Sequence, residues 1–411
     1  MADWRSVKIE DLAAPGKNSL ATGPFGSAIG SRFFREEGVP VLRGSNLSLK
    51  VGDRLLDDEI VFVDESKADE FPRSVARQGD LVFTCWGTIG QVGLVDNRAR
   101  FDRYIVSNKQ MKLTPDPNLV DSLFLYYCLS SPEALAQVQG MAIGSSVPGF
   151  NLTQLRQVEI SCPPLADQKA IAEALGVLDD KIAVNERIAT TARELGLTFY
   201  SQRLHDDDSV EVAVEPLTTA LTRGVAPKYT DSSDELTVLN QKCVRGGRVN
   251  LDPSRLTLRE KVKAHKLLQL NDVLVNSTGV GTLGRVARWT LDLEATVDSH
   301  ITIVRFNEDK VDPVCAGFAM LRAQPEIEAM GEGSTGQTEL RRSQVGELEL
   351  ILPGPAGQKE LRPKLDALEE RADQALRESL SLAALRDTLL PQLMSGKLRV
   401  RDAEKIVEEA V

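Results

Sequence analysis

A tandem repeat constrains the fold of this chain more than any other feature. The segment Gly79–Val95 (GDLVFTCWGTIGQVGLV) returns as Asn271–Trp289 (NDVLVNSTGVGTLGRVARW), about 190 residues later. Later segments match in the same order, including ISCPPLADQKAIAEAL and LILPGPAGQKELRPKL, which contain Gln168 and Gln358. Each copy reads as a β-rich segment, a proline-containing stop and then a long helix. The sequence therefore predicts two copies of one mixed domain.

The second copy contains a glycine pattern like that of a dinucleotide-binding turn. Gly279, Gly281 and Gly284 spell G-x-G-x-x-G. That fingerprint needs a strand before it and a helix after it. The residues that follow, RVARWTLD, alternate between apolar and polar and so indicate a second strand, while the first copy has WGTIG at this place. We therefore predict a β-hairpin whose glycines supply positive φ, not a nucleotide site.

Each copy ends in a helix that is long enough to pair with its counterpart. A helix of about 38 residues is about 57 Å long, which exceeds the need of a small domain. This length favours pairing of the two helices over the alternative that each covers only its own domain. We expect Pro363 to mark the first turn or a kink of the second helix, and Gly396 to end it. The predicted a/d seam consists of Ile171, Leu175, Leu178, Ile182, Leu361, Leu365, Leu368, Leu382 and Leu389.

Composition indicates an ordinary globular protein. Of the 411 residues, 42% are hydrophobic and 27% are charged, and the net charge is −11. This charge opposes DNA coating by bulk attraction but leaves room for local basic patches. The five cysteines and three histidines are scattered without metal-ligand spacing, so we expect reduced thiols and no metal site. We find no membrane-length apolar run and no signal-peptide core, which favours a cytoplasmic protein.

The sequence shows no catalytic constellation that we recognise. The nearest candidate is a nuclease-like set of Asp116 and Asp167 with Lys169, which in principle could hold a divalent metal ion. Asp167, however, opens the predicted helix, where an acidic N-terminal residue is expected anyway. The second copy has Gly357 at that position. We therefore favour a helix cap, and the chain reads as a scaffold with two recognition surfaces.

Amide, hydroxyl and basic side chains gather near the predicted hairpins and loops. Arg, Asn and Gln read base edges, and Lys, Ser and Thr suit phosphates, although a solvated surface role stays open for each residue. The candidates in the first copy are Arg43, Ser45, Asn46, Thr84, Trp86, Thr88, Gln91, Arg103, Asn108, Lys109 and Gln110. Those in the second copy are Asn240, Lys242, Arg245, Arg248, Asn276, Thr278, Thr282, Arg285, Ser299 and His300.

This pattern resembles the specificity subunits of type I restriction–modification systems. The resemblance rests on the two hairpin segments, on GSSVPGFNL, on PPLADQKAIAEALGVLDDKIAVNERI and on ESLSLAALRDTLLPQLMSGKLRV. These segments occur in the family's order and cover nearly the whole chain. In the second copy, GSTGQTEL (Gly333–Leu340) departs from the GSSVPGFN pattern.

The resemblance implies an α+β fold. Two tandem mixed α/β target-recognition domains would be joined by two long helices packed as an antiparallel coiled coil, with a pseudo-twofold internal repeat. We expect a first target-recognition domain at 1–163 and a second at 206–353, spacer helices at 164–205 and 354–397, and a C-terminal tail at 398–411.

The resemblance also implies a function. Such a chain is a non-catalytic, cytoplasmic prokaryotic subunit that recognises a split, or bipartite, target in double-stranded DNA. It docks modification (methyltransferase) subunits and restriction (ATP-dependent translocase and nuclease) subunits, and has no membrane partner. No cofactor is expected in this chain, because S-adenosylmethionine and ATP with Mg²⁺ belong to the partners. The alternatives are a stand-alone metal-dependent nuclease using Asp116 and Asp167, and a protein-binding scaffold without a DNA role.

Overall fold

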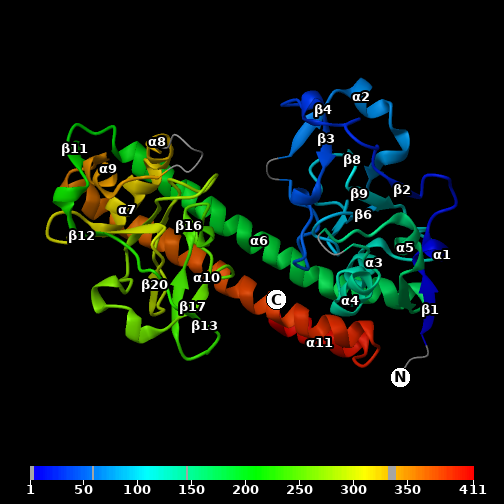
Figure 1. Cartoon of the computed structure of the whole chain (residues 1–411). Helices are drawn as coiled ribbons and strands as arrows, with labels where there is room; N and C mark the ends of the chain where they lie inside the picture. The colour runs from blue at the N-terminus through cyan, green and yellow to red at the C-terminus, as the bar shows by residue number, and fades with distance from the viewer. Residues whose placement is uncertain (1–3, 58–59, 145–146, 332–338) are drawn as a thin grey trace. The chain divides into compact units, whose positions relative to one another are not determined.

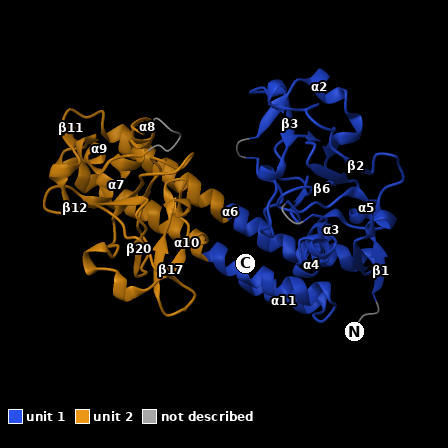
Figure 2. Ribbon diagram, viewed as in Figure 1, with its two compact units in different colours: residues 1–184, 378–411 blue, residues 185–377 orange. Residues whose placement is uncertain are grey.

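The computed structural model describes residues 4–57, 60–144, 147–331 and 339–411, which fall into two compact units (Figures 1 and 2). Unit 1 consists of Met1–Val184 and Glu378–Val411, and unit 2 of Asn185–Arg377. Each unit contains one copy of the repeat together with part of each long helix. These helices are α6 (Leu165–Arg203) and α10 (Pro355–Met394), of 39 and 40 residues. The finer boundaries predicted between recognition domains and helices stay predictions.

Unit 1 is built on two four-stranded sheets. The first has the order β2 (Leu20–Thr22), β9 (Gln110–Leu113), β6 (Leu81–Thr84) and β7 (Val92–Leu94). The second has the order β4 (Val61–Val63), β3 (Val39–Leu42), β8 (Arg103–Val106) and β5 (Val75–Arg77), and β3 pairs parallel with β8. A separate antiparallel pair joins β1 (Arg5–Lys8) to β10 (Glu159–Cys162).

The other helices of unit 1 are short. They are α1 (Ile9–Leu12), α2 (Glu65–Asp69), α3 (Ser122–Leu129), α4 (Pro132–Gly140), α5 (Leu152–Gln157) and α11 (Val400–Ala410), with 3-10 turns at Ser31–Phe33, Gly44–Asn46 and Pro72–Ser74. Asp121 starts α3 by accepting a hydrogen bond from the backbone N–H of Phe124, as an N-cap residue does. The predicted C-terminal tail thus contains a helix, α11.

Unit 2 repeats this architecture. Its first sheet has the order β12 (Thr218–Arg223), β21 (Ile301–Phe306), β18 (Val273–Asn276) and β19 (Val286–Arg288). Its second has the order β13 (Tyr229–Thr230), β17 (Arg255–Thr257), β14 (Leu236–Leu239) and β20 (Ala295–Val297), and β14 pairs parallel with β20. The antiparallel pair is β11 (Val210–Ala213) with β22 (Glu349–Leu352).

Smaller elements complete unit 2. A short hairpin joins β15 (Val244–Arg245) to β16 (Arg248–Val249). The helices are α7 (Pro313–Arg322), α8 (Gln324–Ala329) and α9 (Arg342–Glu347), with 3-10 turns at Glu215–Leu217, Gln241–Cys243, Arg259–Lys261 and Ala264–Lys266. The equivalent strands of the two units carry the repeat that the sequence predicts.

The repeat extends to polar contacts. The side chain of Gln168 accepts a hydrogen bond from the backbone N–H of Asp121 at 2.9 Å, and Gln358 accepts one from Asp312 at 2.9 Å. Gln168 and Gln358 each also donate to the carbonyl of the proline five residues before them. The two glutamines therefore fasten the start of each long helix to the domain before it, which explains why they recur.

The predicted hairpin around the glycine fingerprint is confirmed. Strands β18 and β19 pair antiparallel on either side of it. Gly279, Gly281 and Gly284 have φ of 109°, 73° and 80°, a region that side chains rarely adopt. No helix follows the glycines, so the pattern arises from turn geometry and not from a nucleotide-binding site.

The long helices form part of the core of each unit. In unit 1, Ile171, Leu175, Leu178, Leu382 and Leu389 are buried in one cluster with the aromatic side chains of α3. In unit 2, Leu361 and Leu365 are buried with Tyr200 and Phe318. The remaining seam residues, Ile182 and Leu368, are half-buried. All five cysteines are free and buried.

Helices α6 and α10 pack antiparallel inside each unit. In unit 1, Asp179 contacts Arg386 at 2.8 Å and Lys181 contacts Glu378 at 3.2 Å, so partner numbers fall as α6 numbers rise. In unit 2, Ala189 and Ala192 pack against Ala372, and Gly196 lies beside Leu365. These contacts confirm the predicted α+β fold class with two paired helices.

The two predictions for the ends of α10 had different outcomes. Helix α10 begins at Pro355, so Pro363 lies inside it and not in its first turn, and the alternative of a kink at Pro363 stays a prediction. Gly396 has φ of 64° just beyond the last helical residue, Met394, as predicted for a helix stop. Within the described residues, none of the helices combines the length and the apolar character that crossing a membrane would require.

Candidate nucleic-acid interface

Three loops of unit 1 meet where strands of its two sheets end. We call them loop cluster 1, made of residues 43–48, 85–91 and 107–109. The backbone N–H of Cys85 donates to the carbonyl of Lys109 at 2.7 Å, which ties the second loop to the third. The tip of the second loop is the β6–β7 hairpin. One continuous surface of loops therefore gathers most of the residues that the sequence predicted for the first copy.

Several of these predicted residues hold the loops together. Gln91 is half-buried and donates to the carbonyl of Leu47 at 2.7 Å, while it accepts from the hydroxyl of Thr84 at 2.8 Å. Asn46 is buried and donates to a backbone carbonyl at 2.9 Å. Gln110 is buried and accepts from the hydroxyl of Ser107. The polar groups of these side chains form hydrogen bonds within the protein and support the loops of the surface.

Other predicted residues of loop cluster 1 face solvent. Trp86 is 52% exposed, with Gly149 packed so closely on its ring that a Cβ at Gly149 would lie 2.4 Å from it. Arg43 is half-buried, with its guanidinium 5.7 Å from the centroid of the Phe34 ring. The remaining exposed members are Ser45, Thr88, Asn108 and Lys109. Donors, acceptors, a cation and an aromatic ring are therefore presented together.

Unit 2 has an equivalent set, loop cluster 2, made of residues 240–242, 277–285 and 298–300. The side chain of Asn276 is buried and donates to the carbonyls of Gln241 at 2.9 Å and Thr282 at 3.0 Å, joining the first two loops. The carbonyl of His300 accepts from the backbone N–H of Ser277 at 2.8 Å, joining the second and third. The three loops follow β14, β18 and β20, which are the equivalents in unit 2 of β3, β6 and β8 in unit 1.

The accessible side chains of loop cluster 2 differ from those of loop cluster 1. The hydroxyl of Thr278 lies 2.7 Å from Nδ1 of the exposed His300. Arg285 is half-buried and donates to the carbonyl of Gly281 at 2.7 Å. Lys242 and Ser299 are exposed, Thr282 is half-buried, and Asn240 is half-buried with its amide bonded to the carbonyl of Pro253 at 2.6 Å.

Thr84, Gln110 and Asn276 lie at strand ends that border the loop clusters. Three further predicted residues lie on other elements. Arg103 pairs with Glu65 and with Asp69 at the far end of β8. Arg245 and Arg248 lie on the β15–β16 hairpin, where Arg248 donates to the carbonyl of Ala189 in α6. Burial lowers the pKa of Arg248 from its usual value. These contacts give Arg103 and Arg248 structural partners within their own unit.

The sequence analysis did not predict two exposed apolar side chains, one beside loop cluster 1 and one within loop cluster 2. Phe25 is 78% exposed, and the next residue, Gly26, accepts a hydrogen bond from Asn108 at 2.8 Å. Val280 is 83% exposed in the β18–β19 hairpin. A search for polar and basic residues misses them because their signal is exposure, which only the structure reveals.

The nuclease-like carboxylates take structural positions. Asp116 accepts hydrogen bonds at 2.9 Å from the backbone and the side chain of Asn118, as in an Asx turn. Asp167 lies in the first turn of α6, where a negative charge stabilises a helix. Among the described residues, no group of three or more His, Cys, Asp or Glu side chains is arranged to hold a metal ion.

The GSSVPGFN motif borders loop cluster 1. Gly149, within the motif, pairs with Trp86 in an isolated β-bridge. Residues 145–146 of this motif, and residues 333–338 of its second copy, lie outside the described residues. In that second copy, the described Leu340 donates its backbone N–H to the carbonyl of Ser277 at 2.9 Å.

Comparison with known proteins matches this architecture to one family. A family model described as the type I restriction modification DNA specificity domain matches residues 35–192. A Methanocaldococcus jannaschii protein named as the MjaX specificity subunit of a type I restriction enzyme is 21% identical, over 97% of this chain and 94% of its own length. The HindI specificity subunit of Haemophilus influenzae is 24% identical, over 47% of this chain and 44% of its own length. Residues 35–192 thus match a type I specificity domain, and the chain as a whole is similar to proteins named as type I specificity subunits.

A solved structure agrees with the fold of this chain. The crystal structure of the type I restriction–modification S subunit from M. genitalium covers 95% of this chain and 96% of its own, with 16% identity and a TM-score of 0.55. The relatives are named as specificity subunits, the non-catalytic members of their systems, and this similarity supports the prediction of a non-enzyme over the stand-alone nuclease. The residues that contact a ligand stay predictions.

Proposed function

We propose that this chain is a specificity subunit that binds double-stranded DNA sequence-specifically, and that each loop cluster reads one half of a split target. The observation that carries the proposal is the recurrence of the same three loops on equivalent strands in both units. The framework is repeated, while the exposed side chains differ. A duplicated framework with different contact residues suits a protein that reads two unlike half-sites on one DNA duplex.

The proposed contacts divide into two kinds. Lys109 and Lys242 are exposed cations that suit phosphates. The amide of Asn108 and the ring of His300 suit hydrogen bonds with base edges in a groove. We assign Asn46, Gln110 and Asn276, which are buried, to the support of the loops and not to DNA. The net charge of −11 does not oppose this proposal, because attraction to DNA acts over about one Debye length, roughly 8–10 Å.

We further propose that the chain works inside a larger complex in the prokaryotic cytoplasm. Modification subunits would bind S-adenosylmethionine and methylate DNA, and restriction subunits would use ATP and Mg²⁺. The paired helices α6 and α10 would fix the spacing of the half-sites and offer a docking surface for these partners. The family's printed description, a DNA specificity domain, favours this role over a scaffold without DNA.

Selection from a pool of randomised DNA duplexes tests the proposal. We expect the full chain to enrich duplexes with two conserved blocks separated by a gap of fixed length and free sequence. Lys109→Ala should weaken binding of those duplexes at every sequence and reduce the slope of log K against log salt by about 0.9, because one phosphate contact is lost. Asp180→Ala, on the exposed side of α6, is the matched control. Enrichment of no sequence, or of one continuous block, would refute the proposal.

A further inference from the structure

Phe25 presents an aromatic ring to solvent beside loop cluster 1. Its side chain is 78% exposed, against 52% for Trp86 and 44% for Tyr229, the other large aromatic side chains that are exposed in the described part of the chain. The ring of Tyr229 is covered by the guanidinium of Arg255 at 3.6 Å. The guanidinium of Arg73 lies 5.9 Å from the centroid of the Phe25 ring. Phe25 is thus the most open of the three rings.

The backbone on both sides of Phe25 is fixed. Gly23 donates its N–H to the carbonyl of Gln110 at 3.0 Å and lies so close to the next loop that a Cβ would come within 1.8 Å of the carbonyl oxygen of Ser107. On the other side, Asn108 donates to the carbonyl of Gly26 at 2.8 Å. The ring is therefore held out by a loop that is docked on residues 107–108 of loop cluster 1.

The second copy has no such ring. Gly224 takes the place of Gly23, and a Cβ there would lie 2.1 Å from the carbonyl oxygen of Asp298. The residue two positions later is Ala226, which is exposed. The two loops share their close backbone approach but not the aromatic side chain, so the ring is dispensable for docking the loop.

An aromatic ring on a DNA-reading surface has a defined chemistry. It carries no charge, so it contributes nothing to the release of counterions from phosphates. It can contact the methyl group of thymine or insert at a base step, and both contacts depend on the base sequence. An exposed ring held by a rigid loop loses little freedom when it makes such a contact.

We propose that Phe25 is a specificity-determining residue whose ring contacts the bases of the half-site read by unit 1. This inference rests on the proposed function, because it requires that loop cluster 1 faces DNA. It adds an apolar contact that distinguishes the first half-site from the second. It also separates Phe25 from Lys109, which acts on phosphate.

The experiment compares Phe25→Ala with Phe25→Leu in the full chain, using the randomised duplex pool and then the duplex selected by the wild type. We expect Phe25→Ala to bind that duplex about tenfold to a hundredfold more weakly, the range found when base–aromatic contacts are removed. One or two adjacent positions of one block should lose their preference, while the other block stays unchanged. The slope of log K against log salt should equal that of the wild type. Phe25→Leu should recover part of the affinity.

Controls separate the possible failures. Leu380 on α10 is 64% exposed, and Leu380→Ala should leave binding unchanged, which excludes a general effect of surface apolar area. Because the Phe25 ring is exposed, its removal should leave the unfolding temperature unchanged. If Phe25→Ala selects the same two blocks with wild-type affinity, or changes the salt slope as Lys109→Ala does, the inference is wrong and the proposed function stands. If the wild type selects no sequence, the proposed function fails.

Discussion

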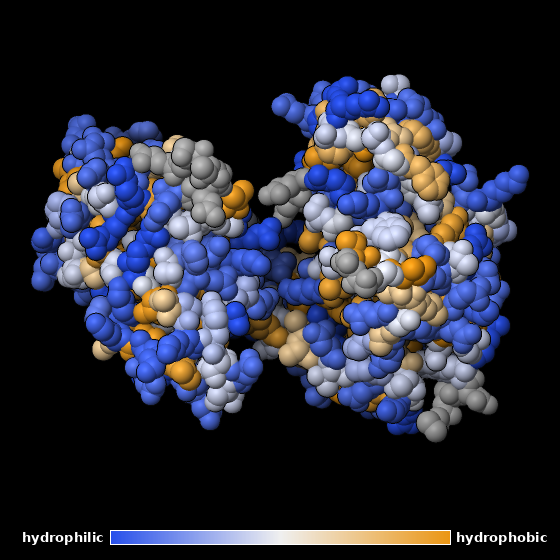
Figure 3. Space-filling view, in the orientation of Figure 1, coloured by the Kyte–Doolittle hydropathy of each residue, from blue (hydrophilic) through white to orange (hydrophobic). Residues whose placement is uncertain are grey.

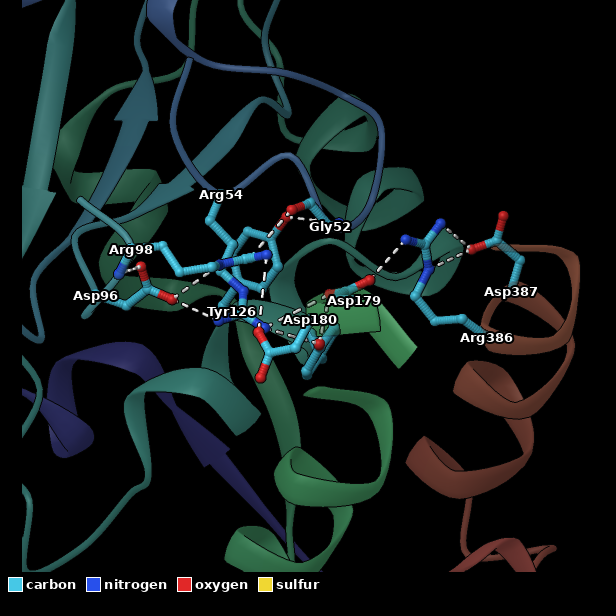
Figure 4. A network of polar contacts seen from close by, with 10 residues as sticks. Gly52, Arg54, Asp96, Arg98, Tyr126, Asp179, Asp180, Arg386 and Asp387 are labelled. Atoms are coloured by element: carbon cyan, nitrogen blue, oxygen red, sulfur yellow. Dashed lines mark hydrogen bonds and ion pairs between the residues drawn. The ribbon is translucent and has the colours of Figure 1, made fainter. Parts of the chain in front are cut away.

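Asp179 of α6 and Arg386 of α10 form a buried ion pair, with 2.8 Å between Oδ1 and Nη1 (Figure 4). The other oxygen of Asp179 accepts a hydrogen bond from the hydroxyl of Tyr127 at 2.5 Å and lies 3.7 Å from the guanidinium of Arg54. Arg54 in turn pairs with Asp96. One carboxylate therefore connects both long helices, helix α3 and the loops of the first domain within unit 1.

The first prediction concerns this carboxylate. Asp179→Asn removes one of the two carboxylates that each of Arg54 and Arg386 contacts, and leaves them Asp96 and Asp387. We expect a loss of stability below the roughly 3–5 kcal/mol that a fully uncompensated buried charge costs. We expect unit 1 to unfold at a clearly lower denaturant concentration, followed by a probe confined to that unit. Asp180→Asn is the control, because that side chain is 65% exposed and reaches Arg98 only at 3.9 Å. Equal midpoints for the two variants would contradict the role given to Asp179.

The second prediction concerns alkaline pH. Burial raises the pKa of Tyr104 and of Tyr126 to about 12, and it also raises the pKa values of Tyr127 and Tyr200 well above the usual value of a tyrosine. In the unfolded chain these hydroxyls ionise near pH 10. The folded state therefore favours the neutral hydroxyl, and the stability it gains is present below pH 10 and is lost as the pH rises from 10 to 12. We expect tyrosinate absorbance to appear together with the loss of folded structure. Ionisation of these buried tyrosines near pH 10 in a chain that stays folded would disprove the assignment.

The third prediction uses the two loop glycines. An added Cβ at Gly23 would meet the carbonyl of Ser107, and one at Gly224 would meet the carbonyl of Asp298. Gly23→Ala should therefore displace the loops of unit 1 and weaken sequence preference in one half-site, and Gly224→Ala in the other. Gly16→Ala, whose Cβ would meet only the hydroxyl of Ser19 at 3.6 Å, should change neither. Binding selection with each variant tests this, and loss of both half-sites from a single substitution would show that the loop clusters do not read separately.

The sequence predicts the repeat, the hairpins and the long helices because each has a local or periodic signal. Gln168 and Gln358 recur because each fastens a helix to its domain, so an internal alignment finds them. The heptad spacing of Leu175 and Leu178 predicts a buried face of α6, and both side chains are buried in the structure.

The same reasoning reaches only part of the candidate site. The sequence does not reveal that the side chains of Asn46 and Asn276 are buried, because an amide occurs both on surfaces and in hydrogen bonds that close loops. Sequence reasoning groups Arg103 with the loops. In the structure, Arg103 lies at the opposite end of its strand, where it pairs with Glu65 and Asp69. Sequence reasoning misses Phe25, because exposure of an apolar side chain depends on how the whole loop docks. Residue type is local, whereas the direction of a side chain is set by tertiary contacts.

Exchange of one recognition segment tests the central claim that each domain reads one half of the target. Residues 1–162 are suited to exchange because Arg5 pairs with Cys162, so the segment is closed by its own strand pair. The measurement is the methylated DNA motif in cells that express the chain with the modification subunits proposed as its partners. Replacing residues 1–162 with those of a relative should change one block of the motif and keep the other block and the gap. Replacing residues 206–353, which contain the matching β11–β22 pair, should change only the other block. A motif in which both blocks change after one exchange, or in which neither changes in an active complex, would contradict the account.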